Sequence, residues 1–144
     1  MRRRDGGLWT IGLLILGLLA TSSRGEEPAG DVLKVVVHIN FAEAGAQGAG
    51  LRSVGNVLKA EPHAKVEVVC HAAGIGLVES ARSDHAALVT ELVRKGVRFV
   101  ACENTMRQKS IRKADLLPGV ETVPSGALEV IRKQQKEGYA YFKP

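Results

Sequence analysis

The fold of this chain is decided by the eight residues Phe99-Val100-Ala101-Cys102-Glu103-Asn104-Thr105-Met106. The first three are apolar and suit a short buried strand, whereas the residues after Cys102 are polar and suit the first turn of a helix. A strand that turns at once into a helix is typical of an α/β sheet, in which ligands and reactive groups gather at the carboxyl ends of the strands. Cys102 is therefore the first candidate for a functional residue.

Strand-like and helix-like segments alternate on both sides of this stretch. Apolar runs rich in β-branched residues predict strands at 32–39, 66–71, 97–102 and 120–123, and a last one at 139–142. Helices are expected between them: one through 51–58 that ends at Pro62, one capped by Ser83 and closed by Gly96, one capped by Thr105 with Gln108, and one from Ser125 to Gly138. This alternation predicts one three-layer α/β/α domain with a mostly parallel sheet of four or five strands.

The first 25 residues have the layout of a secretory signal peptide. Three arginines (Arg2 to Arg4) precede an apolar run from Leu8 to Ala20, and small residues follow. Cleavage after Ser22 and cleavage after Gly25 both fit. An uncleaved membrane anchor is the alternative, but the run is shorter than the roughly 20 residues that span a bilayer. We therefore expect a signal peptide at 1–25, a polar leader at 26–31 and a domain at 32–144, in a protein exported to the periplasm or secreted.

Charge and composition argue against nucleic-acid binding. The chain carries a net charge of +5, but its first 25 residues hold four arginines and one aspartate, so the excess falls by three without them. The small remaining excess is poor evidence for nucleic-acid binding, which needs a clustered basic face, and aromatic residues make up only 4% of the chain. We expect no nucleic acid as a partner, and no membrane association once the leader is removed.

The glycine-rich segment at 45–50 raises the question of nucleotide binding. Gly45, Gly48 and Gly50 begin six residues after the first strand, too late for a dinucleotide fingerprint, and Ser53 stands where a third spaced glycine belongs. No lysine with serine or threonine follows to make a phosphate loop. We expect instead a mobile loop from Ala42 to Gly50 that covers a site, and the sequence indicates no cofactor.

Two histidines end predicted strands, as Cys102 does. His38 and His71 stand at the carboxyl ends of the first and second predicted strands. Asn40 lies two residues after His38, and Asn104 two residues after Cys102. If the first strand lies between the second and third, these groups open onto one edge of the sheet. The alternative is that each histidine is only hydrogen-bonded at a strand end. His63 and His85 fall near a turn and a helix start, where we expect them to be solvated.

Cys102 has three competing interpretations. A disulfide with Cys70 would suit an exported protein, but with the first strand in between, the two cysteines would be too far apart. Zinc would need more ligands, because Cys70 and His71 are adjacent and face opposite sides of their strand, so we expect no metal. Cys102 as a small buried residue stays open. The polar residues after it favour a reactive thiol instead, as does a basic helix that carries Arg107.

Several segments, taken in order, resemble the DsrE/DsrF-like proteins, specifically their small single-domain branch. The resemblance covers about 32–144 and is carried by Lys34-Val-Val-Val-His38, Asn56-Val-Leu58, Val66-Glu-Val-Val-Cys-His71, Gly96-Val-Arg-Phe-Val-Ala-Cys102-Glu-Asn104-Thr-Met106, Val123-Pro-Ser-Gly126 and Gln134-Gln-Lys-Glu-Gly138-Tyr-Ala-Tyr-Phe-Lys-Pro144. It implies a mostly parallel five-stranded sheet and assembly as a homotrimer or hexamer. It also implies sulfur relay through a persulfide on the cysteine that ends a strand, which here is Cys102, with a basic residue at the position of Arg107.

Two functions follow as hypotheses. In the first, Cys102 is the nucleophile of a sulfur carrier that exchanges sulfur with a donor or acceptor protein. His71 or His38 handles protons, and Asn40, Asn104, Thr105 and Arg107 bind the anionic ligand. In the second, the same edge belongs to a non-catalytic module that binds a small ligand or a protein. The reactivity of Cys102 toward a thiol probe separates the two.

Overall fold

The structure, a computed structural model, describes residues 32–144, so the predicted signal peptide and the whole polar leader lie outside the described residues. Five strands alternate with helices along the chain. Their order is β1 (Lys34–Ile39), α1 (Ala44–Ala60), β2 (Lys65–Cys70), the 3₁₀ helix η1 (Ala72–Val78), α2 (Ala86–Arg94), β3 (Arg98–Cys102), α3 (Glu103–Gln108), the 3₁₀ helix η2 (Lys113–Asp115), β4 (Glu121–Val123), α4 (Gly126–Glu137) and β5 (Ala140–Phe142). None of the described helices is long and apolar enough to cross a membrane.

The five strands form one parallel sheet in the order β4-β3-β2-β1-β5. The predicted α/β class and parallel sheet are confirmed, but the expected place of the first strand is wrong. β2 lies between β1 and β3, whereas we expected β1 to lie between β2 and β3. The reason is that each of the first three crossovers steps to the next position on the same side. Only the last step, to β5, returns past β1 to the other edge.

The corrected strand order also changes the argument about a disulfide. Cys70 on β2 pairs with Ala101 on the neighbouring β3, so Cys70 and Cys102 are close in the sheet. Successive side chains on a strand point to opposite faces, so Cys102 faces away from the side that Ala101 and Cys70 share. Both cysteines are free in the structure. The two cysteines are kept apart because their side chains point to opposite faces of the sheet, not because their strands are distant.

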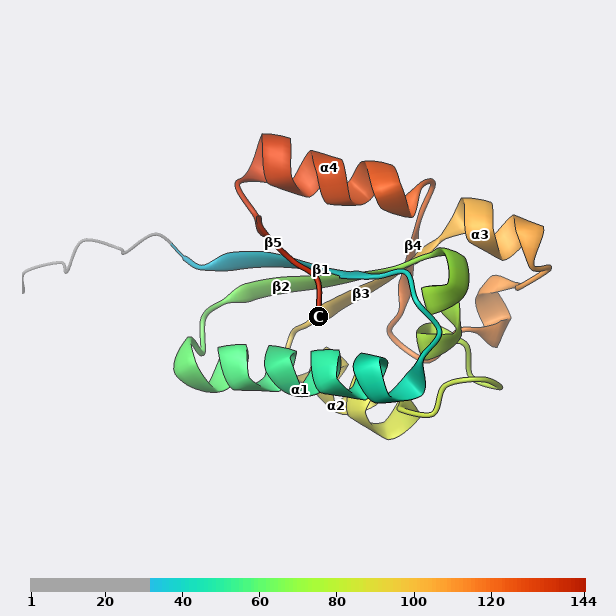
Figure 1. The fold of residues 1–144 in the computed structure, drawn as a ribbon, viewed down its shortest axis with the longest axis horizontal. Helices are drawn as coiled ribbons and strands as arrows, with labels where there is room; N and C mark the ends of the chain where they lie inside the picture. The colour runs from blue at the N-terminus through green and yellow to red at the C-terminus, as the bar shows by residue number, and fades with distance from the viewer. Residues whose placement is uncertain (1–31) are drawn as a thin grey trace, which may run out of the picture.

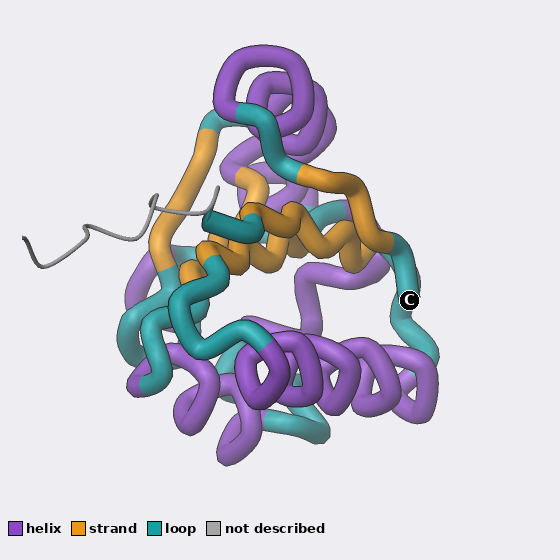
Figure 2. Tube along the Cα trace, turned by 90° about the vertical axis from the view of Figure 1, so that its left-hand side faces the viewer, coloured by secondary structure: helices purple, strands orange, loops and turns teal. Residues whose placement is uncertain are grey.

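The two faces of the sheet are covered unequally. Helices α1 and α2 lie on one side and α4 alone crosses the other, as two perpendicular views show (Figure 1, Figure 2). The larger core lies on the side of α1 and α2 and includes Phe99, Leu51 and Leu92. The smaller core lies under α4 and consists of Val130 and a row of valines, one from each of four strands: Val36, Val69, Val100 and Val123.

Helix α1 begins at Ala44, so the predicted mobile loop from Ala42 to Gly50 is wrong for all but its first two residues. The carboxylate of Glu43 caps the helix by accepting hydrogen bonds from the amides of Gly45 and Ala46. The glycines permit close packing: a Cβ on Gly48 would come within 2.8 Å of His85, and one on Gly50 within 2.6 Å of Pro144. Glycine here serves helix contacts, which a sequence pattern does not distinguish from loop flexibility.

The predicted starts of two other helices are wrong, as is the prediction that His85 is solvated. Helix α2 begins at Ala86 rather than after Ser83, whose hydroxyl instead accepts a hydrogen bond from the amide of His85. The ring of His85 is not free in solvent, because its Nε2 donates to the carbonyl of Ala44 at 2.7 Å. Helix α3 begins at Glu103, which places Thr105 inside its first turn rather than at its cap.

Helix α4 begins and ends where the sequence predicts. The hydroxyl of Ser125 accepts a hydrogen bond from the amide of Leu128, and the helix ends at Gly138, whose φ of 71° is in the left-handed region that favours glycine. This cap fixes Gly126 as the first residue of α4.

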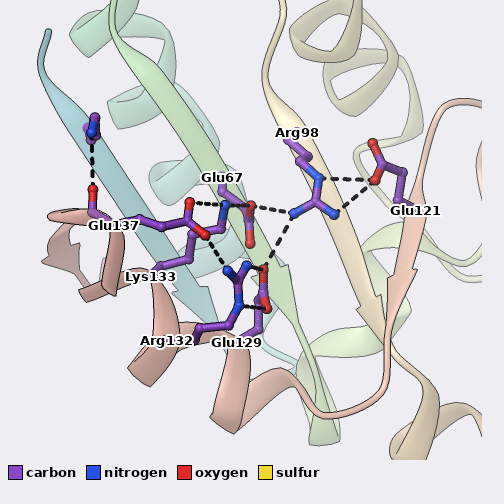
Figure 3. Close-up of polar contacts among 8 residues, drawn as sticks. Glu67, Arg98, Glu121, Glu129, Arg132, Lys133 and Glu137 are labelled. Carbon is purple, nitrogen blue, oxygen red and sulfur yellow. Dashed lines mark hydrogen bonds and ion pairs between the residues drawn. The ribbon is translucent and has the colours of Figure 1, made fainter. Parts of the chain in front are cut away.

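A buried ionic network holds α4 to the sheet (Figure 3). Glu67 of β2, only 1% exposed, accepts from Arg98 at 2.5 Å and lies 3.0 Å from the ammonium of Lys133, which is 7% exposed. Outer residues of the network extend these contacts: Glu121 on β4, and Glu129, Arg132 and Glu137 on α4. The network ties α4 to three strands, β2, β3 and β4.

Candidate functional site

The site is a row of three side chains on the face of the sheet that α4 covers. His38 lies two residues after Val36, His71 two after Val69 and Cys102 two after Val100, so all three point to the same side as these valines. They stand at the carboxyl ends of three neighbouring strands, where parallel sheets place ligands. The structure thus brings His38, His71 and Cys102 to one sheet edge, in a strand order different from the expected one.

Gly126 places His71 and Cys102 beside the first turn of α4. A Cβ on this glycine would lie 2.9 Å from the Cβ of His71 and 3.2 Å from the Cβ of Cys102. Glycine therefore lets the α4 backbone approach both side chains more closely than any other residue would. The sequence Pro124-Ser125-Gly126 shows a glycine at the start of a helix. That this glycine lies against His71 and Cys102 depends on the tertiary structure.

The surroundings of Cys102 favour its thiolate. Burial raises the pKa of the thiol, because Cys102 is only 4% exposed, but nearby donors outweigh this effect and the pKa lies below its ordinary value. These donors are the amides of Gly126, Thr105 and Asn104 and the hydroxyl of Thr105, which stabilise negative charge on the sulfur. By contrast, burial alone raises the pKa of Cys70, which has no such donors. The two cysteines therefore differ sharply in expected reactivity.

Thr105 connects Cys102 to the first residue of η1, which follows β2. Its hydroxyl accepts a hydrogen bond from the amide of Ala72 at 3.0 Å, so its own proton is free to point to the sulfur. Ala72 has a φ of 50°, a left-handed conformation that alanine rarely adopts. Such backbone strain persists where surrounding contacts enforce it, and it concentrates at functional sites. Thr105 is one of these contacts.

Replacing Thr105 with valine is expected to slow the reaction of Cys102 with iodoacetamide at pH 7. The substitution removes a donor to the thiolate, which raises the thiol pKa, and leaves the Ala72 amide without its acceptor, at a cost of about 1 kcal/mol in unfolding free energy. Thr105→Ser, which keeps the hydroxyl, is the matched control and should react like the wild type. Equal rates for the valine and serine variants would show that the hydroxyl does not act on the sulfur.

The two histidines are in direct contact, and a tyrosine extends the pair. Nε2 of His38 lies 2.5 Å from Nε2 of His71, and the rings are nearly parallel. Nδ1 of His38 lies 2.8 Å from the hydroxyl of Tyr141, which faces His38 from the neighbouring strand β5. Burial lowers the pKa of both histidines, and Lys143 lowers both further, as does His71 for His38. The sequence reasoning missed Tyr141, because no pattern shows that β5 pairs with β1.

The remaining candidate residues are more peripheral. Asn104 and Arg107 are exposed on α3 and contact each other, the guanidinium donating to the amide oxygen. Asn40 is half-buried after β1, two strands away from Cys102. A cavity of about 190 Å³ opens at the same edge, with Gln47, Arg82 and Lys109 in its wall, but the two histidines and Cys102 do not line it. The described residues contain no group of three or more histidines, cysteines or acids placed to hold a metal ion.

Comparison with known proteins identifies the family. The model of the DsrE/DsrF-like family matches residues 18–144. The chain belongs to the DsrE/DsrF-like family. Among solved structures, it is similar to MTH1491 of Methanobacterium thermoautotrophicum, a protein of unknown function, with 34% identity, a TM-score of 0.74 and coverage of 78% of this chain and 99% of that one. The resemblance that the sequence segments suggested is confirmed.

A second solved structure shares the fold of this DsrE/DsrF-like chain. The ychN protein of E. coli superposes with a TM-score of 0.63 at 16% identity, over 78% of this chain and all of that one. At this level of identity, the likeness concerns the fold alone. The search of curated proteins found no match.

Proposed function

We propose that this DsrE/DsrF-like protein is a sulfur carrier in which Cys102 holds the transferred sulfur as a persulfide. The observation that supports the proposal most is the set of donors around Cys102, three amides and one hydroxyl that lower the pKa of a nearly buried thiol. A thiolate is the form that attacks sulfane sulfur, and the same donors would stabilise the anion of the persulfide.

The proposed reaction is an exchange without net oxidation. The Cys102 thiolate attacks the outer sulfur of a donor persulfide, R–S–SH, so that a new S–S bond forms on Cys102 as the donor's S–S bond breaks. The donor leaves as R–S⁻ and takes a proton. An acceptor thiolate then attacks the outer sulfur of the Cys102 persulfide. The outer sulfur moves to the acceptor, and Cys102 is released as its stabilised thiolate. A low pKa helps this second step, because a more acidic thiol is a better leaving group. The His38–His71 pair is proposed to exchange the protons.

The limited exposure of Cys102 favours the second candidate function. A thiol that is only 4% exposed is shielded from a large donor protein, as expected if the site binds a small ligand without chemistry. In that function, Asn40, Asn104, Thr105 and Arg107 would bind the ligand, and Cys102 would be incidental.

The test is sulfur uptake measured by mass. The protein without its first 25 residues is incubated with glutathione persulfide, alkylated and analysed as intact protein and as peptides. We expect one added sulfur on the Cys102 peptide, none on the Cys70 peptide and none in Cys102→Ser. Cys70→Ser is the matched control and should keep full uptake. Uptake that survives in Cys102→Ser, or a Cys102 that reacts only after unfolding, would reject the carrier and favour the binding module.

Export and self-association complete the proposal. The basic and apolar N-terminal segment suggests export to the periplasm or secretion, which N-terminal sequencing of the mature protein would test.

Leu128 and Ile131 on the outer side of α4 are 62% and 48% exposed, and such apolar side chains suit burial against further copies in a trimer or hexamer. A monomer in light scattering would contradict this assembly. A donor or acceptor protein for the sulfur is part of the same proposal.

A further inference from the structure

Three side chains form a hydrogen-bonded series from the edge of the sheet to the neighbourhood of Cys102. The hydroxyl of Tyr141, on a side chain that is 44% exposed, contacts Nδ1 of His38 at 2.8 Å, and Nε2 of His38 contacts Nε2 of His71 at 2.5 Å. His71 in turn lies against Gly126, which also touches Cys102. Each link is a single donor and a single acceptor, so the direction of one hydrogen bond determines the direction of the next.

The pair of histidines needs one proton between its facing nitrogens. If both Nε2 atoms carried protons they would repel, and if neither did the contact would lack a donor. One ring is therefore protonated on Nε2, and the other carries its proton on Nδ1. A neutral histidine alone has no such constraint, so the pair has two alternative arrangements, and a third group must choose between them.

Tyr141 is the group that chooses. A phenol O–H is a stronger acid than the N–H of a neutral imidazole, and an imidazole nitrogen is a stronger base than a phenol oxygen, so the bond O–H···Nδ1 is favoured. His38 then holds its proton on Nε2 and donates it to Nε2 of His71. His71 is left with its proton on Nδ1.

We propose that Tyr141 is a positioning residue that sets the protonation tautomer of His71, a residue it does not itself hydrogen-bond, through His38. Nε2 of His71 accepts the hydrogen bond from His38, so the other ring nitrogen, Nδ1, carries the proton and can act as a donor. A donor beside the first turn of α4 favours an anion at Cys102, whether a thiolate or a persulfide. This last step rests on the proposed function, whereas the tautomer of His71 does not.

The experiment records the ring ¹⁵N chemical shifts of the histidines at about pH 8, where neutral imidazoles prevail. In the wild type, we expect His71 to carry its proton on Nδ1 and His38 on Nε2. In Tyr141→Phe, we expect His71 to move toward an even mixture of the two tautomers. His85 is the internal reference, because its bond to the Ala44 carbonyl requires a proton on Nε2 in every variant.

Tyr139→Phe is the matched control. Tyr139 packs against the valine row, with Lys133 over its ring, and makes no hydrogen bond to a histidine within the described chain. Its variant should leave the His71 shifts unchanged. A merely structural role for Tyr141 would alter stability without altering which His71 nitrogen is protonated. An unchanged His71 tautomer in Tyr141→Phe, or a wild-type His71 protonated on Nε2, would overturn the inference.

The link to Cys102 has its own readout. The rate of Cys102 alkylation at pH 7 should fall by about twofold to tenfold in Tyr141→Phe, as expected for a rise in thiol pKa of at most about one unit. A changed tautomer with an unchanged rate would contradict the link to Cys102. A failure of sulfur uptake in the wild type would reject the proposed function and leave the tautomer result standing, so the two failures are distinguishable.

Discussion

Replacing Lys133 with methionine is expected to lower the unfolding free energy by about 3–5 kcal/mol, as breaking a buried ion pair does. Lys133 is 7% exposed and is one of two cations that contact the carboxylate of Glu67, which is 1% exposed. Methionine keeps the length of the aliphatic stem but removes the ammonium that lies over the ring of Tyr139, and the buried charge of Glu67 loses one of its two cations. Urea unfolding at pH 7 measures the loss.

The pH dependence of this loss has a definite sign. Burial raises the pKa of Glu67 above its ordinary value, although bonds from Lys133 and Arg98 work against it. Without Lys133 the charged form is even less favourable, and protonation of Glu67 relieves the cost. Lys133 also lowers the pKa of Glu137, and that contribution disappears as Glu137 becomes protonated. The deficit of Lys133→Met should therefore be largest at neutral pH and shrink as the pH falls toward the ordinary glutamate range.

Two variants test whether the uncompensated charge is the cause. Glu67→Gln combined with Lys133→Met removes both charges and should recover much of the stability, because loss of a whole buried pair is far less costly than loss of one partner. Arg132→Met removes a cation of the same network that is much more exposed, and it should cost about 1 kcal/mol or less. A double variant as unstable as Lys133→Met would show that packing, not charge, carries the effect.

Local sequence patterns were sufficient for the strands and for α4. The apolar runs at β1, β2 and β3 are separated by amphipathic segments of helical period, and Ser125 with Gly138 marks both ends of α4 by cap chemistry that acts within a few residues. The start of α1 was not predictable in the same way. Its glycines suggest a loop, but the close packing of Gly48 on His85 and of Gly50 on Pro144 explains why these helical positions hold glycine.

The candidate site shows the same division. His38, His71 and Cys102 could be selected because each ends a strand, and parallel strands end at one edge. Strand order, the approach of Gly126 and the pairing of Tyr141 with His38 depend on contacts between residues more than 20 positions apart. These non-local contacts turn three separate polar residues into a histidine pair and a thiol with surrounding donors.

Replacing Gly126 with alanine is expected to reduce the reaction of Cys102 with iodoacetamide at pH 7 more than any other change outside Cys102 itself. The new Cβ would lie 2.9 Å from the Cβ of His71 and 3.2 Å from the Cβ of Cys102, and neither neighbour is the flexible end of a side chain. The first turn of α4 must therefore move away and take with it the Gly126 amide, one of the donors that lower the pKa of Cys102. Each unit of increase in that pKa reduces the thiolate about tenfold at neutral pH.

The control for Gly126→Ala lies in another helix. A Cβ on Gly55 of α1 would meet no atom within 4 Å, so Gly55→Ala should leave alkylation unchanged and stabilise the helix by up to about 1 kcal/mol. Overpacking at Gly126 should instead cost about 1–3 kcal/mol in urea unfolding. Rates are compared where both variants are fully folded, so that lost reactivity reports on the site and not on unfolding. A Gly126→Ala protein with wild-type alkylation would show that the α4 amide contributes nothing to the thiolate and that the remaining donors on α3 suffice.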